Sequence, residues 1–221
     1  MQKILLILLL FIISTISIAQ DKEDDKEDDK KDDKKKKEKT YSEIIDDSYK
    51  TDEGLFTVHS KNDKFLYEIS PDLLGKEMLM VTRIAKTANG IGYGGQKINS
   101  QVLRWQKKHD KILLRIVSYE NVASDTLPIS KSVKNSNFEP VLYSFDIKTY
   151  NPSDSSVVID VAPLFKTDVK ALGFPQYRRK SLKITSLDKK RSFIESIKSF
   201  PINIEARSVM TYNSSEPPSL R

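Results

Sequence analysis

Four of the chain's seven glycines lie between Gly90 and Gly95, and their spacing resembles that of loops that bind nucleotides. Gly90, Gly92 and Gly95 satisfy the pattern G-x-G-x-x-G after an expected strand. A dinucleotide site also needs a helix directly after the glycines, because the helix N-terminus holds the pyrophosphate, and here a strand is expected to follow. A phosphate-binding loop needs lysine where Gln96 stands. The segment therefore predicts a flexible loop with positive φ angles between two strands, and no nucleotide cofactor.

The chain has two histidines and no cysteine, and this restricts the metal sites that it could form. Zinc sites draw on His, Cys and carboxylate side chains at helical or turn spacing. His59 and His109 are 109 − 59 = 50 residues apart, and no H-E-x-x-H motif occurs. Because His59 ends an expected strand and His109 lies in an expected turn, both are predicted to be surface histidines. The sequence assigns no metal ligand.

Nucleophilic and acid–base chemistry also lack a recognisable motif. No G-x-S-x-G elbow is present. Asp46 and Asp47 lie on an expected short polar helix, where no burial would raise a carboxyl pKa toward a catalytic value. The sequence therefore assigns no catalytic and no cofactor-binding residue, and we predict that this chain alone is inactive as an enzyme.

The elements that would position any site are mostly strands. Apolar residues alternate or run together in several short segments separated by turn residues. Two segments are predicted to be helices, and Ser70-Pro71-Asp72 predicts a single helical turn that ends at Gly75. The expected strands are 55–60, 64–70, 77–86, 100–108, 111–120, 141–150, 155–162 and 202–212; the expected helices are 42–54, from the capping Ser42 to Gly54, and 188–199. Trp105 is assigned to the core. Successive strands with few helices predict an α+β fold, mostly antiparallel β-sheet with a few short helices.

The first 39 residues are expected to lie outside the folded part. Residues 1–19 carry one lysine, an apolar run from Ile4 to Ile13 and small residues up to Ala19, which is typical of a secretory signal peptide. A retained membrane anchor is the alternative. Every residue from Asp21 to Lys39 is charged, so residues 20–39 predict a disordered linker. These features predict export to the periplasm, the cell surface or the medium, without stable membrane insertion after cleavage.

Charge and cysteine content restrict the partners of the folded part. The net charge of +6 includes two basic clusters, Arg178-Arg179-Lys180 and Lys189-Lys190-Arg191. Export argues against nucleic acid as a partner, and both clusters are predicted to be solvated turns. Without cysteine no disulfide holds the fold, so its core must suffice.

A family resemblance rests on a long ordered series of segments. These are YSEII, GLFTVH, LYEISPDLLGKEMLMVTRI, GYGGQKINSQVLRW, SNFEPVLYSFDI, SSVVIDVAPLF and KKRSFIESIKSFPINIEARSVMTY. In this order they resemble the N-terminal region of a family of exported bacterial zinc-dependent metalloproteases. In that family, two domains of unknown function precede a metzincin-like catalytic domain bearing H-E-x-x-H-x-x-G-x-x-H. The resemblance implies a short domain at residues 40–83 and a longer β-rich domain at residues 84–221.

The catalytic domain of that family is absent from this chain, so no catalytic residue and no zinc ligand is carried over. The loop-like residues after the last strand suggest that the longer domain is truncated. Two functions are therefore expected. The chain is either a non-catalytic portion of a secreted zinc peptidase, partnering a catalytic domain and its peptide or protein substrate, or an independent exported module. The latter would recognise peptide or glycan through the Gly90–Gly95 loop with Tyr93 and Trp105.

Overall fold

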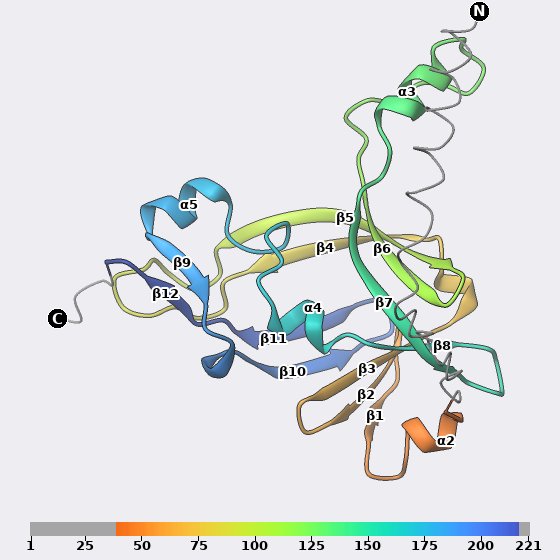
Figure 1. The fold of residues 1–221 in the computed structure, drawn as a ribbon, viewed down its shortest axis with the longest axis horizontal. Coiled ribbons are helices and arrows are strands. Elements are labelled where there is room, and N and C mark those ends of the chain that lie inside the picture. The colour runs from red at the N-terminus through yellow and green to blue at the C-terminus, as the bar shows by residue number, and fades with distance from the viewer. Residues whose placement is uncertain (1–38, 217–221) are drawn as a thin grey trace, which may run out of the picture. The chain divides into compact units, whose positions relative to one another are not determined.

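The computed structural model describes residues 39–216, which form one antiparallel β-sheet structure with short helices (Figure 1). The expected signal peptide and almost all of the expected linker lie outside the described residues. The large sheet has eight strands in the order β1-β2-β3-β8-β7-β6-β5-β4. Its strands are β1 (Lys50–Asp52), β2 (Thr57–Lys61), β3 (Lys64–Ile69), β4 (Glu77–Arg83), β5 (Lys97–Lys108), β6 (Lys111–Val117), β7 (Val141–Tyr150) and β8 (Val157–Asp160). The predicted fold class is confirmed.

Two smaller antiparallel sheets and six short helices complete the described part. One small sheet pairs β10 (Phe193–Ser199) with β11 (Ile204–Val209), and the other pairs β9 (Ile184–Leu187) with β12 (Tyr212–Ser214). The helices are α2 (Tyr41–Ile44), α3 (Ser130–Ser136), α4 (Ala162–Lys166) and α5 (Gln176–Ser181), with the 3-10 turns η1 (Pro71–Leu73) and η2 (Lys189–Arg191). Among residues 39–216, no helix is long and apolar enough to cross a membrane.

The large sheet joins distant parts of the chain. Strand β3 pairs with β8, so that Leu66 lies opposite Asp160, while β4 pairs with β5. Residues on both sides of the expected boundary at 83 and 84 are therefore strands of the same sheet. Every residue of β3 from Phe65 to Ile69 is buried, as expected for a strand covered on both faces.

Aromatic side chains dominate the core. The Trp105 ring packs against Phe56, Tyr67 and Phe145, with centroid distances of 5.8, 6.3 and 5.6 Å respectively. Such tilted and edge-on contacts suit the charge distribution of aromatic rings. Only 6% of Trp105 is exposed, which confirms its assignment to the core.

A second contact joins the hairpin of β10 and β11 to the first strands. Ser199 is buried and donates its hydroxyl to the Phe56 carbonyl at 2.6 Å, while its own N–H donates to Asp52 at 2.9 Å. The Leu55 N–H donates to the Phe200 carbonyl at 2.7 Å. A Cβ on Gly54 would lie 2.5 Å from the Ser199 Oγ, so this close approach requires glycine.

The expected helix at 188–199 is wrong, because the segment forms η2 followed by β10. Asp188 ends β9 by accepting main-chain hydrogen bonds from Lys190 and Arg191. The register of β10 then shifts between Ile194 and Ser196, which is a β-bulge. The extra residue places Ile194 and Ile197, three positions apart, in the core, and this spacing imitates a helical face.

The first helix is also shorter than expected. It begins after Thr40, whose N–H donates to Glu43 at 2.7 Å, and not at Ser42. It ends at Ile44 because Asp46 accepts hydrogen bonds from the Ser48 main chain and hydroxyl, forming a local turn that competes with helix. Strand β1 occupies part of the remaining segment.

Candidate functional site

The predicted glycine loop lies between β4 and β5. Gly90, Gly92 and Gly95 have φ angles of 79°, 134° and 84°, which confirms the predicted positive values. The Ile84 carbonyl accepts from the Gly95 N–H at 2.7 Å, and Arg178 of α5 donates to the Ile91 carbonyl at 3.2 Å. The loop is therefore held at its base and by a guanidinium from a distant element.

Arg178 brings one basic cluster to the glycine loop. A small pocket beside it is lined by Ile84, Gln96, Lys97, Ile98, Phe174, Pro175, Tyr177 and Arg178. Among the described residues, the buried Oε1 of Gln96 has no hydrogen-bond partner. Two of the lining residues, Lys97 and Arg178, are cations, so the pocket wall is basic.

Aromatic side chains at this surface differ from those expected. Tyr93 is 69% exposed and Tyr177 is 72% exposed, whereas Trp105 lies in the core. Trp105 therefore does not belong to a recognition surface. Tyr177 was missed because a lone tyrosine beside a basic cluster carries no periodic or motif signal.

The prediction that residues 178–180 form a solvated turn is wrong for Arg179. Its guanidinium is buried, forms a bidentate pair with Asp168 and donates to the Phe174 carbonyl at 2.9 Å. The hydrogen bonds from Arg179 hold the pKa of Asp168 below its ordinary value. The Tyr212 hydroxyl donates to the same carboxylate at 3.2 Å. Arg179 thus anchors α5 to its neighbouring loop and to β12.

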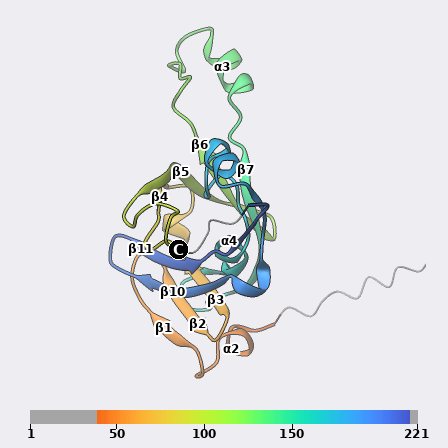
Figure 2. The same cartoon turned by 90° about the vertical axis from the view of Figure 1, so that its left-hand side faces the viewer.

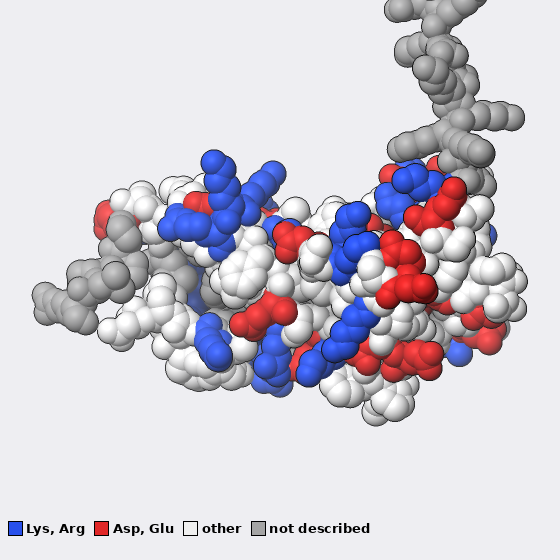
Figure 3. All heavy atoms as spheres, turned by 90° about the horizontal axis from the view of Figure 1, so that it is seen from below, with Lys and Arg blue, Asp and Glu red and all other residues white. Residues whose placement is uncertain are grey.

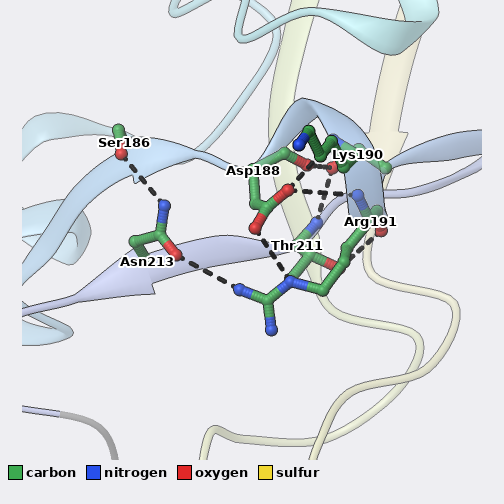
Figure 4. A network of polar contacts seen from close by, with 7 residues as sticks. Ser186, Asp188, Lys190, Arg191, Thr211 and Asn213 are labelled. Carbon is green, nitrogen blue, oxygen red and sulfur yellow. Dashed lines mark hydrogen bonds and ion pairs between the residues drawn. The ribbon is translucent and has the colours of Figure 1, made fainter.

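The second basic cluster lies at the corner between β9 and β10 (Figure 4). Arg191 pairs with Asp188 at 2.9 Å and donates to Asn213 at 3.2 Å, and Asn213 donates to Ser186. The network joins β12 to η2. On the face drawn in Figure 3, basic and acidic side chains are interspersed and form no surface of one sign.

A buried polar network surrounds Glu68, and sequence reasoning missed it. The Glu68 carboxylate accepts from Tyr41 and Asn151, both at 2.6 Å, and lies 3.0 Å from the Nε2 of His59. The Nδ1 of His59 lies 2.9 Å from the Thr51 hydroxyl. Burial alone would raise the pKa of Glu68, but the hydrogen bonds from His59, Tyr41 and Asn151 outweigh it and lower this pKa.

His59 is 3% exposed, so the prediction of a surface histidine is wrong there. It lies on β2 beside the fully covered β3, and a strand-end position in the sequence did not reveal that. Glu68, within the apolar run of β3, was the available signal, because a buried carboxylate needs partners. The chain Thr51–His59–Glu68 has the order of a hydroxyl–imidazole–carboxylate relay, yet its contacts join neighbouring strands and α2. We assign it a structural role.

The described residues do not fit a zinc site. Within the ranges that the structure describes, no three His, Asp or Glu side chains gather where they could hold a metal ion. Both ring nitrogens of His59 already contact protein groups. His109 lies in the turn between β5 and β6 with a φ of 54°.

An arm between β6 and β7, residues 118–140, extends away from the large sheet and carries α3 (Figures 1 and 2). Its sides are joined by Asn121, which donates to Asn137 at 3.0 Å, and by the pair of Lys134 with Asp125. Large apolar side chains are exposed on it: Val122 (70%), Leu127 (51%), Ile129 (59%) and Phe138 (74%). We call residues 118–140 the apolar arm.

Comparison with protein families identifies the class of this chain. Residues 95–220 match the domain of unknown function DUF5117, and residues 38–87 match the domain of unknown function DUF5118. Because the first match covers more than half of the chain, the chain belongs to the DUF5117 family. Comparisons with curated proteins and with solved structures gave no match.

Proposed function

We propose that this chain is a non-catalytic region of an exported zinc-dependent metallopeptidase, and that it supports or shields a separate catalytic domain. The resemblance of its ordered sequence segments to the N-terminal region of such peptidases supports the proposal. The observation that carries it is the apolar arm, because large exposed apolar groups gathered on one projection mark a protein interaction site.

The composition of the apolar arm suits contact with a folded protein. Ile129 and Phe138 are more than half exposed, while the guanidinium of Arg115 lies 5.0 Å from the Phe138 ring centroid. An aromatic ring held by a cation is a preorganised anchor, and buried aromatic and aliphatic anchors dominate binding energy at interfaces. The arm is the element that would insert into the catalytic domain.

Binding to a catalytic domain tests this proposal directly. The chain from Gln20 to Arg221 is titrated calorimetrically with a purified metzincin-type catalytic domain of a peptidase that the sequence resembles. The double change Ile129→Asp and Phe138→Asp should raise the Kd about tenfold or more, because two apolar anchors become charged. Ile202→Asp is the matched control, since Ile202 is 86% exposed but lies outside the arm.

The same preparation gives a second measurement. With added zinc, the chain alone should hydrolyse peptide substrates no faster than a heat-denatured sample. Equal Kd values for wild type and the arm variant, absence of binding, or hydrolysis that a chelator abolishes would each refute the proposal. Circular dichroism establishes that the variants are folded.

A further inference from the structure

Strand β4 is an edge of the large sheet. Within residues 39–216 it pairs with β5 on one side and with no strand on the other. The opposite edge, β1, has three residues, whereas β4 has seven and contains no proline. Natural sheets usually protect long edges, because the unpaired main-chain groups can bind another strand.

Residues of β4 alternate between the core and solvent. Met78 and Met80 are half-buried and pack against the core. Leu79 is 67% exposed and Val81 is 40% exposed, and they share the outward face with Glu77 and Arg83 at the two ends. The outward face thus has two apolar side chains between one anion and one cation.

This arrangement is complementary to itself. If two β4 strands run antiparallel with Met80 opposite Met80, Glu77 lies opposite Arg83 of the second copy, and Leu79 lies opposite Val81 of the second copy. Opposite charges and apolar pairs directly across two strands both stabilise a sheet. We propose that two copies of this chain associate through their β4 edges in this register, which continues the sheet across a two-fold axis.

The charged ends of β4 are positioned for this pairing. The Glu77 carboxylate is held by Arg104 at 2.6 Å and by the Tyr119 hydroxyl. Arg83 donates to the Gly95 carbonyl at 3.3 Å through one nitrogen, and its remaining N–H groups can reach a facing carboxylate. A heterologous extended peptide lacks this two-fold match, so the second copy is the occupant that the charges favour.

Charge reversal tests the register. Sedimentation velocity of the chain from Gln20 to Arg221, over a wide concentration range, should show a dimer in equilibrium with monomer. Arg83→Glu and Glu77→Lys should each raise the dissociation constant of the dimer about tenfold or more, because both symmetric ion pairs become repulsive. An equimolar mixture of the two variants should dimerise as wild type does, since each repels itself and attracts the other.

Lys108→Glu is the matched control, because it makes the same charge change as Arg83→Glu at an exposed position of neighbouring β5. It should leave the dimer unchanged. A wild-type monomer at all concentrations, insensitivity to both reversals, or failure of the mixture to associate would overturn the proposal. Loss of the dimer in the arm variant with retention in Arg83→Glu would place self-association on the apolar arm instead. Calorimetric binding to the catalytic domain is measured separately, so the two proposals can fail independently.

Discussion

Glu68 is a buried carboxylate at which side chains from three separate elements meet. Its carboxylate joins α2 through Tyr41, β2 through His59 and the turn after β7 through Asn151. These contacts lower its pKa, so the folded state binds the Glu68 proton less readily than the unfolded state. The resulting stability is present above the ordinary carboxyl pKa and is lost as the pH falls through the lowered value.

We therefore expect Glu68→Gln to lower the free energy of unfolding by about 2 kcal/mol near neutral pH, because charge-assisted hydrogen bonds are lost. The loss should shrink as the pH falls below 4.5, the ordinary carboxyl value. Urea unfolding at neutral and acidic pH measures both effects. Glu53→Gln, at an exposed carboxylate, is the control. An equal loss at every pH would contradict the assigned role of the ionised carboxylate.

At the scale of elements, the hairpin of β10 and β11 is fixed to β1 and β2 by a close main-chain approach at Gly54. A Cβ there would lie 2.6 Å from the Phe200 carbonyl oxygen. Real contacts are longer, so the two segments would have to separate.

Gly54→Ala should lower the free energy of unfolding by about 2 kcal/mol through overpacking. Gly90→Ala is the comparison, because its φ of 79° strains alanine but no atom lies within 4 Å of the added Cβ. That change should cost only about 1 kcal/mol of backbone strain. Urea denaturation of both variants measures the difference. A smaller effect at Gly54 than at Gly90 would show that the approach is not tight.

Sequence patterning predicts elements better than it predicts their partners. The strands expected at 100–108 and 111–120, with His109 in the turn between them, form the hairpin of β5 and β6, so this prediction is confirmed. The segment after Asp188 was assigned to helix because a β-bulge gives Ile194 and Ile197 a helical spacing. Arg179 and His59 were expected at the surface, since burial of a polar residue depends on partners distant in the chain.

Only the part of the candidate site that depends on local sequence could be predicted. Clustered glycines predicted the loop between β4 and β5, whose φ angles agree. That Arg178 contacts this loop depends on tertiary folding alone, because the two are 178 − 91 = 87 residues apart along the chain. No strand or helix was predicted between residues 121 and 140, so the apolar arm and its helix α3 were not foreseen.

For the whole molecule, the two matched family segments share one sheet and one core. Strand β3 from the first segment pairs with β8 from the second, and Tyr67 packs on Trp105. Separating the two segments would break the pairings of β3 with β8 and of β4 with β5 and would expose the core residues that they share.

Residues 39–87 and residues 88–221, produced separately, should therefore both be largely unfolded. Amide proton NMR dispersion and circular dichroism measure this, with residues 39–221 as the intact control. A dispersed spectrum from residues 39–87 alone would show that the first segment is an independent domain, which is the division that the sequence predicts at residue 83.

The pairing of Leu66 with Asp160 spans 160 − 66 = 94 residues, and it sets the order of events during synthesis. Loop closure over such a distance is slow, and a ribosome makes chain at about 5–20 residues per second. The apolar strand β3 therefore pairs with β2 first and emerges several seconds before its second neighbour, β8, exists. During that interval the unpaired edge of β3 is accessible to chaperones and proteases. The time for which it stays accessible is set by how soon β8 is synthesised.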